Sequence, residues 1–344
     1  MNPIPQKKLG LLSRKSVSLS PSDLVLLGNL DEGFPLPMLA RPGVEGVSLR
    51  GWFANNRNQV AKLLASSGAI LFRGFAIETA VEFEKIAEVG ANGTLMNYSF
   101  RSTPRKEVEG KIYTSTEYPA DQSIPMHNEM SYTSTWPLKI WFFCSRPALE
   151  GGETPIADSR RIYHRIDPGI RMQFEGKGVL YIRNYGDGLD LAWEDVFQTT
   201  DRSAVDRFCQ EAGIEAEWKP GNRLRTQQRC QGIARHPATG ETVWFNQAHL
   251  FHRSSLDPVL LEKLIEAFGK DGLPRDAHYG DGRPIEASVL EEIRAAYDEE
   301  SVAFPWEPGD LLMVDNMLVA HGRRPFRGER KILVAMAEPH REAR

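Results

Sequence analysis

The pattern of apolar and polar positions divides the chain into many short strand candidates and a few helices. Apolar residues recur at helical spacing over residues 51–66, 79–89, 258–268 and 286–300. Short apolar runs bounded by turn residues predict strands, which lie at residues 68–75, 138–144, 178–183, 226–235, 241–246, 309–316 and 331–337. Residues 151–159 predict a glycine turn, a short strand and a helix start at Asp158 or Ser159. This arrangement favours a mainly β fold with flanking helices (α+β), built on a double-stranded β-helix (jelly-roll) core.

Two segments lie outside this pattern. Residues 1–45 look irregular, so we predict an irregular N-terminal segment there and a single jelly-roll domain with helical insertions over residues 46–344. Residues 91–125 are rich in Ser, Thr, Pro, Arg and Asn. A loop of this length in a compact domain is usually a lid or a binding loop, or else disordered. We therefore expect a substrate loop there, with a disordered loop as the alternative.

Charge and cysteine content narrow the class of protein. The net charge of -4 provides no basic field that would attract nucleic acid. The three cysteines are too few and too widely spaced for a disulfide framework, which fits a reducing compartment. No apolar run is long enough to span a membrane, and the N-terminal apolar pieces are too short for a signal peptide. We expect a cytoplasmic protein without nucleic-acid or membrane partners; the oligomeric state stays open.

One short motif suggests metal chemistry. His127 and Glu129 lie two residues apart, so on an extended backbone both side chains project from the same face. A third ligand has to come from elsewhere, and His321, in a predicted loop just after an apolar strand, is the best candidate. Two histidines and one carboxylate form the facial triad of non-heme Fe(II) oxygenases, which leaves coordination positions open. An isolated His-x-Glu triplet also arises by chance, so the motif needs support from other segments.

That support comes from a resemblance to a known family. The sequence resembles the TauD/TfdA superfamily of Fe(II)/2-oxoglutarate dioxygenases through four segments in the family's order, namely residues 125–132, 146–160, 243–252 and 315–336. The resemblance covers roughly residues 50 to 340. It is greatest with the clavaminate-synthase-like and syringomycin-type aspartyl β-hydroxylase branches, which act on amino acids.

The resemblance implies roles for five residues. His127, Glu129 and His321 match the metal ligands. Thr154 matches the position whose hydroxyl contacts a 2-oxoglutarate carboxylate, and Arg330 matches the arginine that pairs with the distal carboxylate. A guanidinium suits this task because it offers a planar fork to a carboxylate. The neighbouring cations are rivals for the same role, namely Arg323, Arg324, Arg327 and Lys331.

The implied activity is O₂-dependent hydroxylation, or desaturation, of an unactivated C–H bond, coupled to decarboxylation of 2-oxoglutarate. The implied substrate is an amino acid, free or tethered to a peptidyl carrier protein, in specialised metabolite or antibiotic biosynthesis. Residues 331–337 lack the second arginine of taurine-type relatives, which disfavours a sulfonate, and Glu129 disfavours a halogenase. The alternatives are a catabolic dioxygenase of a small carboxylate and a non-catalytic jelly-roll sensing or binding protein.

Substrate contacts are predicted at polar residues near these motifs. The candidates are Asn97, Arg101 and Arg105 in the long loop, Asn128 and Ser131 beside the metal motif, and Asn246 and Gln247 at a strand end. For the long loop, plain solvation is an equal alternative. A carrier protein could dock on Arg101, Arg105 and the arginines of residues 323–327. His249 and His252 are not expected to bind the metal, because three better ligands exist.

Overall fold

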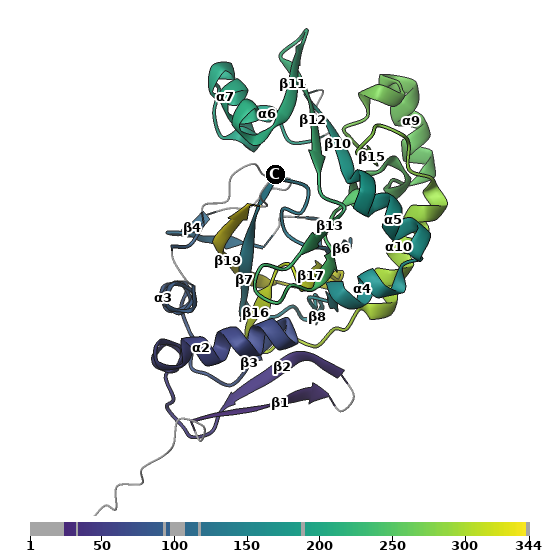
Figure 1. The fold of residues 1–344 in the computed structure, drawn as a ribbon. Helices are drawn as coiled ribbons and strands as arrows, with labels where there is room; N and C mark the ends of the chain where they lie inside the picture. The colour runs from purple at the N-terminus through teal and green to yellow at the C-terminus, as the bar shows by residue number, and fades with distance from the viewer. Residues whose placement is uncertain are drawn as a thin grey trace, which may run out of the picture.

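A computed structural model describes residues 24–31, 34–91, 94–96, 107–115, 118–186 and 190–341. Within these residues, the largest element is a mostly antiparallel eight-stranded sheet in the order β1-β2-β3-β16-β7-β19-β5-β4 (Figure 1). In that order the strands are Val25–Asp31, Phe34–Pro42, Ala69–Phe72, Leu311–Asp315, Thr135–Arg146, Lys331–Arg341, Ile112–Thr114 and Glu107–Glu109.

Smaller sheets form a second layer against one face of this main sheet. A three-stranded sheet has the order β6 (Ile124–His127), β17 (Val319–Arg323) and β9 (Ile156–Asp158). Two-stranded sheets join β13 (Ile233–Arg235) to β14 (Thr242–Trp244) and β8 (Glu150–Gly151) to β18 (Phe326–Arg327). Apolar side chains of β9, β13, β14 and β17 share one buried cluster with the main sheet, so the two layers enclose a common core.

The central strand β7 explains why the main sheet is covered on both faces. Successive side chains of a strand point to opposite faces. Ile140 and Phe142 accordingly join the cluster between the layers, while Trp141 and Phe143 join a second cluster with α2 (Leu49–Ser67) and α3 (Ala80–Gly90). Because residues 140–144 of β7 are apolar at every position, they must be buried on both sides, and here sheets cover one side and helices the other (Figure 1).

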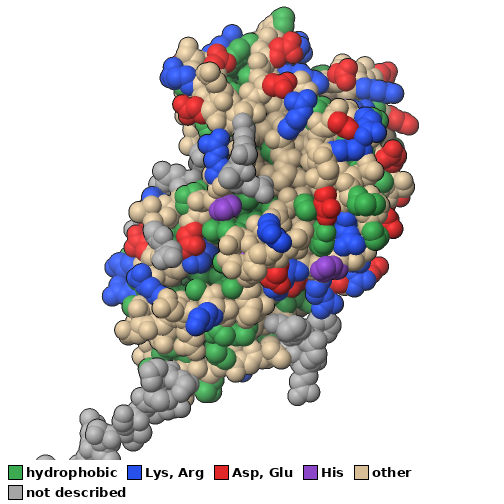
Figure 2. Space-filling view, viewed as in Figure 1, with side chains coloured by type: hydrophobic (Ala, Val, Ile, Leu, Met, Phe, Trp, Pro, Cys, Tyr) green, Lys and Arg blue, Asp and Glu red, His purple; other side chains and the backbone are tan. Residues whose placement is uncertain are grey.

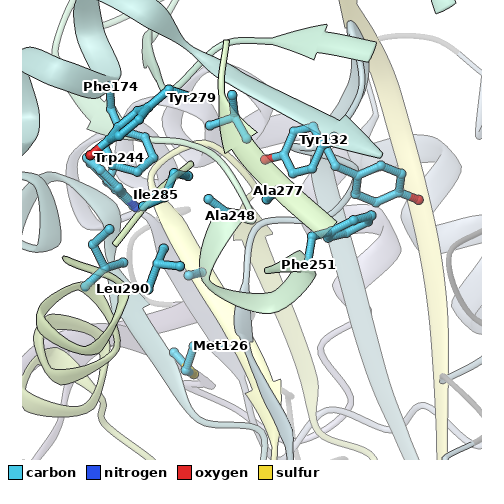
Figure 3. Close-up of a cluster of buried hydrophobic side chains, with 14 of the residues drawn as sticks. Met126, Tyr132, Phe174, Trp244, Ala248, Phe251, Ala277, Tyr279, Ile285 and Leu290 are labelled. Atoms are coloured by element: carbon cyan, nitrogen blue, oxygen red, sulfur yellow. The ribbon is translucent and has the colours of Figure 1, made fainter. Parts of the chain in front are cut away.

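A third cluster lies beneath the remaining sheet, whose order is β11 (Ile214–Lys219), β12 (Arg223–Cys230), β10 (Val179–Tyr185) and β15 (Arg275–Tyr279). Figure 3 shows its aromatic side chains, among them Tyr132 and Phe251, whose ring centroids are 5.2 Å apart. The other helices are α4 (Ser159–Arg165), α5 (Pro168–Lys177), α6 (Trp193–Phe197), α7 (Arg202–Ala212), α8 (Ala248–Phe251), α9 (Pro258–Phe268) and α10 (Ala287–Glu300).

The predicted helices and strands are confirmed with small shifts at their ends, and the single predicted strand over residues 226–235 is divided into β12 and β13. The predicted irregular segment over residues 1–45 is wrong for residues 25–31 and 34–42, which form β1 and β2. These runs lack a clear alternation of apolar and polar positions. Pairing with a neighbouring strand keeps them extended instead, since β2 runs parallel to β3, with Leu39 opposite Leu71. The long stretch over residues 91–125 likewise contains β4, β5 and the start of β6.

Basic and acidic side chains are interspersed over the face shown in Figure 2, without a continuous basic stripe. Among the helices that the structure describes, none combines the length and the apolar character that crossing a membrane requires.

Candidate active site

Two paired strands bring the predicted metal ligands together. His127 ends β6 and lies directly opposite His321 of the antiparallel strand β17, and their ring centroids are 4.6 Å apart. With Glu129 they form a group whose potential ligand atoms all lie within 4.8 Å of one another. The prediction that His321 lies in a loop is wrong, since it is inside β17. The strand extends through it because β17 pairs with β6 on one side and with β9 on the other.

The donor set suits one divalent iron ion. Nδ1 of His127 is 2.8 Å from the carbonyl oxygen of Pro125. A carbonyl can only accept, so Nδ1 carries the proton and Nε2 carries the lone pair that a metal requires. Glu129 and His321 are both buried, and together the three side chains supply two imidazoles and one carboxylate. This set fits Fe(II) with one face of the ion left open.

Buried amides hold the backbone of the metal motif. The backbone N–H of Glu129 donates to Oδ1 of Asn316 at 2.7 Å. Nδ2 of Asn316 donates back to the carbonyl of Glu129 at 2.9 Å. Asn128 faces the opposite way from its neighbours, and its Nδ2 donates to Oγ of Ser159 at 3.0 Å and to the Asn316 carbonyl at 2.7 Å. Asn316 was not predicted as a site residue. In the sequence, the role of Asn316 was indicated by its position, since a polar side chain follows an apolar strand directly there.

Arg330 lies in the cavity that contains the two histidines. Its Nε donates to the Gly152 carbonyl at 2.8 Å, Nη1 to Oγ of Ser115 at 3.3 Å and Nη2 to Oγ1 of Thr154 at 3.4 Å. Burial, with a smaller effect of nearby Arg323, lowers the pKa of Arg330 to about 10. Among the described residues no carboxylate forms an ion pair with it. A partly buried cation with neutral partners suits the binding of an anion.

Thr154 lines this cavity, and Gly152 lies against Arg330. Thr154 is buried, and its Oγ1 also accepts a hydrogen bond from Nε1 of Trp306 at 3.2 Å. Gly152 has a φ of +74°, and a Cβ placed there would lie 3.0 Å from Cδ of Arg330 and 3.0 Å from Cβ of Phe326. The glycine therefore allows the backbone to approach the arginine side chain closely. Thr154, Arg330 and the histidines line one cavity, as the resemblance implied.

The four cations that rival Arg330 for the 2-oxoglutarate carboxylate have different surroundings. Arg323 also lines the cavity, but it donates to the carbonyls of Tyr118 at 3.0 Å and of Pro119 and Gln122 at 2.6 Å each. It thus holds the chain segment before β6. The other three cations are exposed and do not line the cavity, namely Arg324, Arg327 and Lys331.

A larger cavity of about 570 Å³ shares His127 and Glu129 with the metal group. That volume is typical of small-molecule sites. Its walls are mostly apolar, with residues Ile124, Leu191, Leu250, Phe251, Leu256, Leu260 and Leu264 (Phe251 in Figure 3). Its polar side chains include the ion pair of Arg275 and Asp190, in which Nε and Nη2 contact the two carboxylate oxygens at 2.5 and 2.6 Å.

The strand that carries Arg275 is anchored by its next residue. Asp276 is buried and receives hydrogen bonds from Arg253. Burial raises the pKa of Asp276, but hydrogen bonds from His278 and Arg253 outweigh it and lower the pKa to about 2. Since neighbours in a strand face opposite sides, Arg275 points to the cavity while Asp276 is held against the protein.

The predicted substrate residues separate into three groups. Asn97, Arg101 and Arg105 lie outside the described residues. Asn128, Ser131 and Asn246 are fully buried, line neither cavity and hydrogen bond to other groups of the protein. Gln247 lines the larger cavity. Sequence spacing did not distinguish these groups, because all seven residues are polar and close to a motif.

His249 and His252 are not part of the metal group, as expected. Nε2 of His249 is 2.9 Å from the Met126 carbonyl, and its ring stacks on Tyr297. Burial is the main reason that its pKa is lowered to about 3, so His249 is neutral at physiological pH. His252 bonds within its own turn, with Nδ1 2.9 Å from Oγ of Ser254.

Comparison with known proteins agrees with the fold and the site. The family described as "Taurine catabolism dioxygenase TauD, TfdA family" matches residues 32–336. The Dapdiamide synthesis protein DdaC of Enterobacter agglomerans is 40% identical over 310 residues, 90% of this chain and 93% of that protein. Enduracididine beta-hydroxylase of Streptomyces hygroscopicus is 43% identical over 54 residues only, 15% of this chain and 16% of that protein.

Among solved structures, PvcB of Pseudomonas aeruginosa has a TM-score of 0.54 and 18% identity, covering 93% of this chain and 92% of that chain. The likeness confirms the predicted fold class, a sheet-dominated protein with a jelly-roll core. Fold and site together define an Fe(II)- and 2-oxoglutarate-dependent dioxygenase. The chain belongs to the TauD/TfdA family.

Proposed function

We propose that this protein hydroxylates an unactivated C–H bond of an amino acid, free or tethered to a peptidyl carrier protein, in specialised metabolite biosynthesis. His127, Glu129 and His321 hold Fe(II), and Thr154 and Arg330 bind 2-oxoglutarate. The observation that carries the proposal is the shared cavity: the histidines and a partly buried guanidinium line the same space. That space adjoins, through His127, a larger cavity suited to a second small molecule.

The protein's own groups orient the reactants and exclude water. Fe(II) with 2-oxoglutarate and O₂ supplies an oxidant that removes hydrogen from an unactivated C–H bond. Arg330 fixes the distal carboxylate of 2-oxoglutarate, and the hydroxyl of Thr154 contacts a carboxylate of the same molecule. The apolar wall of the larger cavity keeps water from the target carbon, and a fixed approach of that carbon decides where oxygen is inserted. Desaturation is a variant outcome of the same arrangement.

Two relatives support the substrate class and its setting. DdaC takes part in dapdiamide synthesis by its name, and it aligns with 90% of this chain. The local match to enduracididine beta-hydroxylase points to hydroxylation of an amino acid. The cavity itself fits an amino acid, since apolar walls adjoin the charged groups of Asp190 and Arg275. The three cysteines are free, which suits the reducing cytoplasm as the place of action.

A carrier protein would need a basic surface close to the cavity. Arg323 is buried and donates to backbone carbonyls, so it does not serve as a docking residue. Arg324 and Arg327 are exposed, and Arg327 lies 3.4 Å from Glu150. We therefore expect Arg324→Glu to slow oxidation of a carrier-bound substrate without affecting a free one. Unchanged turnover of the loaded carrier would contradict docking at this surface.

The test is a mass measurement on two substrate sets. Enzyme reconstituted with Fe(II) without oxygen is mixed with 2-oxoglutarate and either free L-amino acids or the same amino acids loaded on a carrier protein, and O₂ is then admitted. A gain of one oxygen identifies the set that contains the substrate. Succinate release without an oxidised product in either set would reject the amino-acid class. Succinate release no greater than that of a His127→Ala control would reject the proposed enzymatic activity altogether.

A further inference from the structure

Gln247 connects the metal motif to the larger cavity. It is the last residue before α8, and it lines the cavity together with His127 and Glu129. Its Nε2 donates at 2.7 Å to the carbonyl of Asn128, the residue between those two ligands. Its backbone N–H donates to the hydroxyl of Tyr181 at 2.7 Å. Both the backbone and the side-chain nitrogen of Gln247 are therefore fixed.

These contacts decide which end of the amide faces the cavity. The Asn128 carbonyl can only accept a hydrogen bond, so the amide end beside it must be the NH₂ group. The other end is then Oε1. Among the described residues, none donates a hydrogen bond to Oε1, yet this atom is not one of the fully buried side-chain atoms without a partner. Gln247 as a whole is only 4% exposed, so the accessible part of its side chain faces the cavity.

We propose that Oε1 of Gln247 accepts a hydrogen bond from an N–H group of the substrate, the ammonium group of the amino acid. An oxygen that can only accept pairs with an ammonium or amide N–H, and it does not pair with a carboxylate or a carbonyl. This hydrogen bond holds the carbon next to that nitrogen near Asn128, the residue between the metal ligands His127 and Glu129. Gln247 thus selects for a nitrogen and sets the distance of the target carbon. The inference rests on the proposed function and adds to it the chemical group of the substrate that Gln247 recognises.

A matched pair of variants isolates this role. Gln247→Met keeps the length of the side chain and removes the acceptor. The control is Gln231→Met, because Nε2 of Gln231 likewise donates at 2.7 Å to a backbone carbonyl, that of Ser131, but Gln231 does not line the larger cavity. Both variants leave one carbonyl without its donor, so a merely structural role predicts similar losses of thermal stability and similar kinetics. If Gln247→Met folds poorly, Gln247→Leu, which also lacks the acceptor, replaces it and should show the same loss of preference. Gln247→Glu, which keeps an acceptor, should retain the preference for the nitrogen.

The probes are pairs of candidate substrates, and the two members of a pair differ only in whether the 2-amino group is present. Each free L-amino acid is compared with the carboxylic acid lacking the 2-amino group, and each pair is also tested as thioesters on a phosphopantetheine-bearing carrier. We expect wild-type enzyme to favour the amino compound in kcat/KM by about 10- to 100-fold, as for a hydrogen bond to a charged group. In Gln247→Met this preference should collapse to within about 3-fold, and succinate release should become uncoupled from product. Gln231→Met should keep the wild-type preference.

The outcomes separate this inference from the proposed function. If wild-type enzyme oxidises an amino compound but Gln247→Met keeps the full preference for the nitrogen, the inference is wrong and the proposed function stands. The same holds if wild-type enzyme oxidises both members of a pair equally well. If no member of either set is oxidised by wild-type enzyme, the proposed function fails and the inference falls with it.

Discussion

Gly152→Ala should weaken 2-oxoglutarate binding, because the new methyl group would crowd the side chain of Arg330. Gly152 has a φ of +74°, where an L side chain costs about 1–2 kcal/mol. The added Cβ would also lie 3.0 Å from Cδ of Arg330. That side chain has to shift by a few tenths of an ångström, which disturbs its 2.8 Å hydrogen bond to the Gly152 carbonyl and moves the guanidinium. Losing one hydrogen bond to a charged group raises the KM for 2-oxoglutarate about 10-fold or more.

Gly240→Ala is the matched control. Gly240 has a φ of +72° and nothing within 4 Å of the new Cβ, so this variant has the same conformational cost without crowding an arginine. Thermal unfolding should show a similar loss of stability for both variants. Steady-state succinate release should show a raised KM for 2-oxoglutarate in Gly152→Ala alone. Equal KM values in the two variants would refute the role given to Arg330.

Three further variants test the metal group and two buried charges. Anaerobic Fe(II) should raise the Tm of the wild-type protein but not of His127→Ala, which should also release no succinate; an equal rise in both would exclude His127 as a ligand. Asp310→Ala removes the carboxylate 2.7 Å from buried Arg73, so urea unfolding should show a loss of about 3–5 kcal/mol, while exposed Asp281→Ala should change little. The pKa of Asp276 is lowered from 3.8 to about 2, so its stabilisation, roughly 2 kcal/mol, is present above pH 4 and lost as the pH falls towards 2. Asp276→Asn should flatten that part of the stability profile, and an unchanged profile would rule out this source.

The sequence alone determined the helices α2, α3, α9 and α10, most core strands and the metal motif. Helices such as α9 could be predicted because their apolar residues recur at helical spacing, and Asp257 with Pro258 marks the start. His127 and Glu129 could be predicted to face the same way because the side-chain period of a strand is two. Thr154 and Arg330 followed from family motifs, since a chemical role fixes residue type and order along the chain.

The tertiary structure decided what depends on pairing between distant segments. His321 was placed in a loop by its local sequence, but pairing with β6 and β9 extends the strand through it and brings its ring to His127. Residues 25–31 and 34–42 became strands because β1 pairs with β2 and β2 pairs with β3. Hydrogen bonds between distant segments also decided the roles of the polar residues near the motifs. Asn128 donates to Asn316 and points into the interior, whereas Gln247 donates to Asn128 through Nε2, so its Oε1 faces the cavity. A local pattern carries no information about such partners, because they lie far away along the chain: 188 positions separate Asn128 from Asn316 and 119 separate it from Gln247.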